Sequence, residues 1–61
     1  MLTPRQLEMA GLVAQGLTNK EIARQMGCSL STVKHYVSAI MGLWDAKNRV
    51  QVALKYREGE R

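Results

Sequence analysis

The chain contains no phenylalanine, one tryptophan, two tyrosines, one proline and one cysteine among its 61 residues. The single cysteine, Cys28, excludes an internal disulfide framework. No apolar run approaches the roughly 18 residues of a membrane span, and the first residues lack the apolar core of a secretory signal. With a free thiol and no visible signal, we expect a cytoplasmic protein that does not enter the membrane.

The usual signatures of catalysis and metal binding are also missing. The sequence has no paired-carboxylate site, no Ser/His/Asp set beyond what chance supplies, and no phosphate-cradling glycine loop. Cys28 and His35 fall short of the usual ligand set of a structural zinc site. We therefore expect neither an enzyme nor a protein that depends on a metal or a cofactor.

Acidic residues are few relative to basic ones. Nine lysines and arginines stand against five aspartates and glutamates, which gives a net charge of +4 and a pI near 9.7. This balance favours a polyanion as partner. The length corresponds to one small domain, residues 1–61, without a linker or an internal repeat. A chain this short buries only about 60% of its unfolded surface, so we expect a marginal core that is aliphatic and rich in methionine.

Strand-like alternation is absent, and the sequence divides into four pieces of helical length. Gly16, Gly27 and the Ala46–Asn48 stretch separate these pieces. The first helix is predicted over Pro4–Gln15, and the fourth begins at Asn48. The pattern predicts an all-α, four-helix bundle with a central helix-turn-helix.

Each predicted helix follows a residue whose side chain can cap its first turn. These caps are Thr3, Thr18, Ser29 and Asn48. A glutamine or glutamate three residues after Thr3, Thr18 and Asn48 has the spacing of a capping box. Gly16 can end the first helix in the left-handed conformation, and Asp45 can end the third, because aspartate tolerates that conformation better than most residues.

The third helix has two contrasting faces. One apolar line contains Val33, Val37, Ile40 and Trp44. At about 100° per residue, the opposite line carries Ser31, His35, Ser38 and Gly42, with Lys34 on its flank. We expect the tryptophan line to be core and the opposite face to be open to solvent.

A short helix, a turn containing Gly27 and a longer helix with a polar outer face form the helix-turn-helix layout. In such motifs the second helix lies in the major groove of DNA. Lys34 can donate to guanine O6 or N7, and Thr32, near the helix start, can reach a phosphate. The same layout also occurs in bundles that bind nothing, so the layout alone leaves both interpretations open.

The fourth predicted helix carries apolar residues on two sides. Val50, Ala53 and Leu54 are expected to form its inner face. Val52 and Tyr56 then lie on roughly the opposite side, which favours a contact with a second copy, although single exposed apolar residues are also normal.

Four blocks of the sequence resemble the LuxR-type (LuxR/FixJ/GerE) helix-turn-helix domain. They are Leu2-Thr3-Pro4-Arg5, Gly16-Leu17-Thr18-Asn19-Lys20-Glu21-Ile22-Ala23, Ser31-Thr32-Val33-Lys34 and Asn48-Arg49-Val50, in register over about residues 2–56. The resemblance implies a bacterial transcription regulator that binds duplex DNA sequence-specifically in the bacterial nucleoid. It also implies that the third helix is the recognition helix and that the fourth forms a homodimer contact, with RNA polymerase as a possible further partner.

The resemblance assigns a role to individual residues. Lys34 matches the lysine that commonly reads bases, and His35 and Ser38 match the variable positions beside it; Ser31 lies on the same face. Lys20 and Thr32 match positions that often meet phosphates. Asn48 and Arg49 match the motif that opens the fourth helix and approaches the DNA backbone. Val52 and Tyr56 match the dimer surface.

Some residues depart from the family pattern. Gly42 and Leu43 replace a pair that is often basic, and Gly42 inside a helix predicts a closely packed neighbour. The reduced charge and the Val52/Tyr56 stripe favour an alternative function: a protein-interaction module of the same fold that binds a partner helix or a polymerase subunit.

Overall fold

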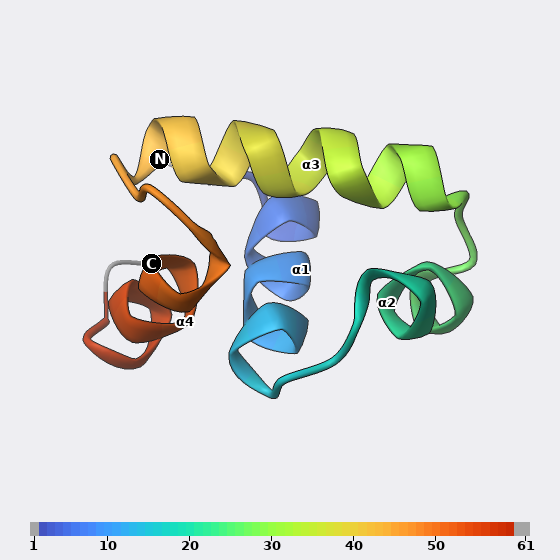
Figure 1. Cartoon of the computed structure of the whole chain (residues 1–61), viewed down its shortest axis with the longest axis horizontal. Coiled ribbons are helices and arrows are strands. Elements are labelled where there is room, and N and C mark those ends of the chain that lie inside the picture. Colours follow the sequence, from blue (N-terminus) through green and yellow to red (C-terminus); the bar gives the residue numbers. More distant parts are fainter. Residues whose placement is uncertain (1, 60–61) are drawn as a thin grey trace.

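The computed structural model describes residues 2–59, which form four helices and, within that range, no strand. The helices are α1 (Pro4–Ala14), α2 (Asn19–Met26), α3 (Leu30–Leu43) and α4 (Arg49–Arg57). In Figure 1, α3 lies along the top of the molecule and α1 runs beneath its middle, with α2 and α4 on either side of α1. The predicted all-α fold with a central helix-turn-helix is confirmed.

The predicted caps form at the start of all four helices. Thr3 with Gln6 and Thr18 with Glu21 make complete capping boxes, in which each hydroxyl accepts from the third helical residue. In return, Gln6 Oε1 accepts from the Thr3 backbone N–H at 2.9 Å, and Glu21 Oε1 accepts from that of Thr18 at 2.8 Å. Ser29 and Asn48 also accept from the third helical residue of α3 and α4.

The helix ends follow the expected chemistry with small shifts. Gly16 and Gly27 have φ values of +86° and +68°, the left-handed conformation that stops α1 and α2. Asp45 has φ +53° directly after Trp44, the cap of α3, as predicted. The first helix ends at Ala14, one residue before the predicted end, and Gln15 is its cap.

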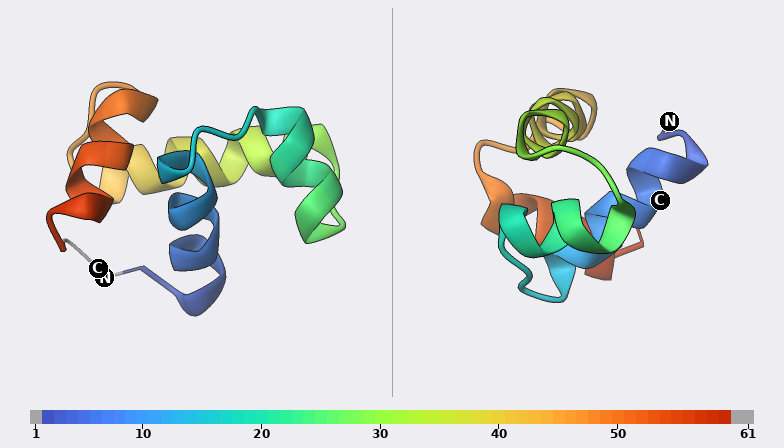
Figure 2. Two further views of the ribbon diagram at one scale, coloured as in Figure 1. Left: turned by 90° about the horizontal axis from the view of Figure 1, so that it is seen from below. Right: turned by 90° about the vertical axis from the view of Figure 1, so that its right-hand side faces the viewer.

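The core is aliphatic and contains methionine, as the composition predicts. Its fully buried large side chains are Met9, Ile22, Val33, Ile40 and Val52. Helix α1 supplies the centre, because it packs against each of the other three helices. Figure 2 shows this arrangement from two more sides, with α2 and α4 well separated from each other.

Two expectations about packing are wrong. Nothing lies within 4 Å of a Cβ placed on Gly42, so this residue has no closely packed neighbour. Helix α4 is also rotated relative to the prediction: Val52 is fully buried, whereas Val50 and Leu54 are 65% and 48% exposed. Val52 is therefore unavailable for a dimer contact, and Tyr56 is half-buried against the core.

The physical reason for the rotation lies in the length and composition of α4. Its nine residues carry apolar side chains on nearly every side, so periodicity alone does not select an inner face. Contact with α1 selects it instead, because Tyr56 packs over Gly11.

Over the described residues, no helix has both the length and the apolar character needed to cross a membrane.

Candidate nucleic-acid interface

The outer face of α3 is open to solvent along its whole length. Ser31, Lys34, His35, Ser38 and Gly42 are all exposed. The opposite line is buried and contains Val33, Val37, Ile40 and Trp44. The predicted orientation of this helix is confirmed, and the structure brings the expected base-reading residues together on one face.

This face carries positive charge and no acidic residue. Helix α3 contains neither aspartate nor glutamate between Leu30 and Leu43. Lys34 supplies an ammonium group with three donors, and His35 can donate or accept through its ring nitrogens. The His35 ring is tilted by 54° to the half-buried Tyr36 ring, with centroids 6.3 Å apart. The face therefore offers short hydroxyls, one histidine and one lysine to a ligand.

The first turn of α3 is organised by hydroxyl groups. Ser29 Oγ accepts from the Thr32 backbone N–H at 3.1 Å and lies 2.9 Å from Thr32 Oγ1. The first backbone N–H groups of any helix lack an intrahelical acceptor and favour an anion. Thr32, predicted to reach a phosphate, thus lies beside a helix start with its hydroxyl already paired to the cap.

The start of α2 combines an exposed lysine with a capping carboxylate. Lys20 is exposed at the second position of the helix. The hydrogen bond from the Thr18 backbone N–H lowers the pKa of Glu21 below its ordinary value of 4.5, and the Thr18 hydroxyl and Arg24 lower it further. Glu21 is therefore ionised at neutral pH and used by the cap, while Lys20 extends into solvent.

The two residues expected to approach DNA from α4 also have internal roles. Asn48 Oδ1 accepts from the Gln51 backbone N–H at 3.0 Å. The half-buried Arg49 donates from Nη1 to Asn19 Oδ1 at 2.6 Å and from Nη2 to the Leu17 carbonyl at 2.8 Å. Sequence reasoning did not find this second role of Arg49, because its partners lie about thirty residues away in the chain.

Comparison with protein families matches residues 1–56 to the family described as bacterial regulatory proteins, luxR family. The chain belongs to the LuxR family. This finding agrees with the fold and confirms the resemblance seen in the four sequence blocks. The exposed face of α3 therefore belongs to a LuxR-type helix-turn-helix.

Two relatives of this LuxR-family domain are bacterial response regulators. The two-component response regulator PprB of Pseudomonas aeruginosa is 49% identical over 53 residues, which cover 87% of this chain and 19% of PprB. The nitrate/nitrite response regulator protein NarL of Escherichia coli is 43% identical over 53 residues, 87% of this chain and 24% of NarL.

A third relative is the DNA-binding transcriptional activator DevR/DosR of Mycobacterium tuberculosis, 40% identical over 53 residues, 87% of this chain and 24% of the activator. The chain thus spans between about a fifth and a quarter of the length of these proteins.

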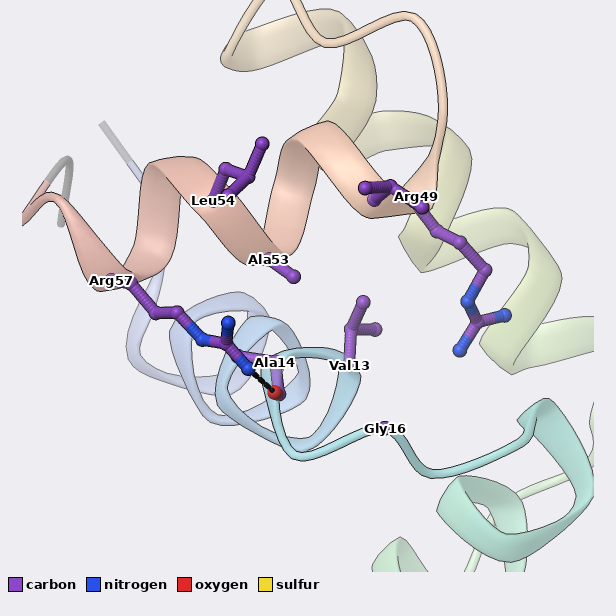
Figure 3. A pocket seen from close by; sticks show the side chains of 8 residues that line it. Val13, Ala14, Gly16, Arg49, Ala53, Leu54 and Arg57 are labelled. Carbon is purple, nitrogen blue, oxygen red and sulfur yellow. Dashed lines mark hydrogen bonds between the residues drawn. The ribbon is translucent and has the colours of Figure 1, made fainter.

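Two further arginines of this LuxR-family domain, Arg5 and Arg57, also connect helices. Arg5 Nη2 donates to the Met26 carbonyl at the end of α2 at 2.9 Å, and Arg57 Nη2 donates to the Ala14 carbonyl at the end of α1 at 3.1 Å. Figure 3 shows Arg57 reaching across from α4 to Ala14. Sequence reasoning missed these two hydrogen bonds. Their acceptors are backbone carbonyl oxygens, which every residue has, so no residue type identifies them.

The lysines of the LuxR-family domain behave differently. Within residues 2–59, their side chains make no hydrogen bond or ion pair with the rest of the chain. They are Lys20, Lys34, Lys47 and Lys55. The positive charge available to a polyanion therefore includes these four lysines and the exposed Arg24.

A shallow apolar hollow lies between the end of α1 and α4. Val13, Val50, Ala53 and Leu54 line it, together with the two arginines Arg49 and Arg57.

Over the described range, no three histidine, cysteine, aspartate or glutamate side chains come close enough to hold a metal ion. Cys28 is half-buried in the turn between α2 and α3.

Proposed function

We propose that this LuxR-family domain binds duplex DNA sequence-specifically and regulates bacterial transcription, with α3 in the major groove. The observation that carries the proposal is the exposed, acid-free outer face of α3, held outward by the burial of Val33, Val37, Ile40 and Trp44 on the other side. The relative DevR/DosR is a DNA-binding transcriptional activator, which supports the same conclusion. The proposed DNA-binding unit is the whole of residues 1–61, acting at the nucleoid.

Base contacts are assigned to the exposed residues of α3. Lys34 donates to guanine, and Ser31, His35 and Ser38 contact the neighbouring base edges. The serines are short, which allows the helix backbone to approach the floor of the groove. Because these contacts are made to base edges, they determine which sequence is bound.

Phosphate contacts are assigned to residues at the starts of α2, α3 and α4. Lys20 at the start of α2, Thr32 at the start of α3, and Asn48 with Arg49 at the start of α4 face the sugar–phosphate backbone. Such contacts release counterions, so the affinity must fall as the salt concentration rises. Lys20 is the simplest of these contacts, because its ammonium group is exposed and unpaired within the described residues.

Homodimer formation through α4 is proposed with corrected residues. Val50 and Leu54 are the exposed apolar residues of this helix, so they replace Val52 and Tyr56 as the contact. Two copies joined in this way would read a repeated site.

A protein-interaction module remains the second candidate. The specific observation in its favour is the apolar hollow beside Val50 and Leu54, which a partner helix or a polymerase subunit could occupy. This contact would depend on apolar burial and would respond weakly to salt.

Selection from a random pool of duplexes tests the proposal and separates the two candidates. We expect enrichment of a defined site whose affinity falls by about 0.9 log units per tenfold increase in salt for each phosphate contacted. A pool that shows no enrichment, or binding that is insensitive to salt, would contradict the DNA-binding proposal.

A further inference from the structure

Arg49 connects the start of α4 to the start of α2. Its Nη1 donates to Asn19 Oδ1 at 2.6 Å, and its Nη2 donates to the Leu17 carbonyl at 2.8 Å, in the segment that leads into α2. Arg49 and Asn19 are both half-buried and are the first helical residues of α4 and α2. The connection therefore joins two helix N-termini that are distant in sequence.

No other packing brings these two helices together. Helix α2 packs against α1 and α3, and α4 packs against α1 and α3, but within the described residues no Cα atom of α2 lies within 8 Å of a Cα atom of α4. Figure 1 shows them on opposite sides of α1. The Arg49 side chain crosses this gap, so it restrains a distance that the core controls only indirectly.

The residues beside this connection are the proposed phosphate contacts. Lys20 directly follows Asn19, and Asn48 directly precedes Arg49; both are exposed. In the proposed complex, the N-terminus of α2 with Lys20 and the N-terminus of α4 with Asn48 contact the DNA backbone separately. We call them the Lys20 arm and the Asn48 arm. A phosphate contact depends on the position of its arm, because the phosphates of a duplex have a regular spacing.

We propose that Arg49 is a positioning residue for DNA binding, which acts through Asn19 to hold the Lys20 arm at the correct distance from the Asn48 arm. This inference rests on the proposed function. It replaces the direct phosphate contact first assigned to Arg49, because both Nη atoms donate within the domain and the effect of the guanidinium on affinity is exerted through Lys20.

The chemistry of arginine suits this role. Its planar fork directs two donors at two oxygens at once, whereas a lysine ammonium is a single point charge on a flexible stem. Asn19 Oδ1 and the Leu17 carbonyl are neutral acceptors, so their geometry, rather than charge pairing, holds the guanidinium in place. Arg49→Lys therefore keeps the charge and removes the fork.

The test compares Arg49→Lys, Lys20→Ala and the double variant. The probe is the duplex recovered by selection with the unaltered chain, and its dissociation constant is measured by fluorescence anisotropy. All measurements are made at a temperature at which circular dichroism shows every variant to be folded. This condition separates a positioning role from a role in stability alone.

We expect Arg49→Lys and Lys20→Ala each to weaken binding by about fivefold or more. In the Arg49→Lys background, Lys20→Ala should cost less than about twofold, because the arm is already displaced. Arg57→Lys is the matched control: it removes a guanidinium from the other end of α4, bound to Ala14, and should leave the effect of Lys20→Ala unchanged.

Asn19→Ala provides a second route if Arg49→Lys does not fold. It removes the acceptor and keeps the arginine, and it should reproduce both the loss of affinity and the coupling to Lys20. Binding by Arg49→Lys within twofold of the unaltered chain would overturn the inference. So would an undiminished effect of Lys20→Ala in that background, which indicates a direct phosphate contact. If the unaltered chain enriches no duplex, the proposed function itself fails, and this result precedes any comparison of variants.

Discussion

The Tyr56 hydroxyl lies directly over Gly11, where α4 crosses α1. A Cβ on Gly11 would be 3.0 Å from the hydroxyl oxygen of Tyr56 and 3.2 Å from its Cζ. These distances are shorter than ordinary van der Waals contact, so the absence of a side chain at Gly11 permits the close approach of the two helices. The contact also explains why α4 turns its Val52 side toward the core.

We predict that Gly11→Ala is less stable than Gly42→Ala by about 1–3 kcal/mol in the free energy of unfolding. Both changes replace a helical glycine and gain a similar helix propensity, of about 1 kcal/mol. Only Gly11→Ala must displace the Tyr56 ring, because the space around Gly42 is open. Urea denaturation of the two variants measures the difference, and equal stabilities would contradict this account of the α1–α4 contact.

Lys34→Ala should weaken binding to the selected duplex by about 1–3 kcal/mol and relax the preference at one base pair. The reason is the loss of a donor to guanine from the exposed face. The fold should be unaffected, since Lys34 is exposed and makes no internal bond within residues 2–59. Lys55→Ala, on α4, is the matched control and should retain base preference. Unchanged specificity in Lys34→Ala would remove this residue from the base contacts.

Leu54→Asp and Val52→Asp should have opposite consequences. Leu54 is 48% exposed, so Leu54→Asp should leave the domain folded and shift it toward the monomer in sedimentation equilibrium. Val52 is fully buried, and an unpaired carboxylate there should cost several kcal/mol and unfold the domain. A folded Leu54→Asp variant with unchanged self-association would exclude the outer side of α4 from the dimer contact.

Glu21→Gln should reduce the sensitivity of the domain to acid. The folded pKa of Glu21 is lowered, chiefly by the hydrogen bond from the Thr18 backbone N–H, so its contribution to stability is present above its ordinary pKa of 4.5. That contribution is lost as the pH falls through the lowered folded pKa.

Glutamine preserves the capping box, as Gln6 shows in α1, but does not titrate. Melting temperatures measured between pH 7 and about pH 3 should therefore decline less steeply for Glu21→Gln. Parallel declines in the two proteins would contradict this role of Glu21.

Local patterns in the sequence were sufficient to predict the four helices, their caps and the orientation of α3. Thr3, Thr18, Ser29 and Asn48 mark helix starts through interactions within three residues, which need no knowledge of the fold. The apolar line of α3, from Val33 to Trp44, continues over about three turns, so its inner face is unambiguous. The candidate site depends mainly on that face, and for this reason its residues could be named in advance.

Tertiary contacts decided the rotation of α4 and the hydrogen-bond acceptors of the arginines. The short helix α4 has apolar residues on both sides, and only the fit of Tyr56 against Gly11 selects Val52 for the core. Arg49 finds its acceptors on a segment about thirty residues away, through a meeting of two chain segments that no local pattern encodes. The sequence by itself therefore determined the helices and the exposed face of α3, because these depend on neighbouring residues. Only the folded chain determined which side of α4 is available and how its first residue is anchored, because those depend on contacts between distant segments.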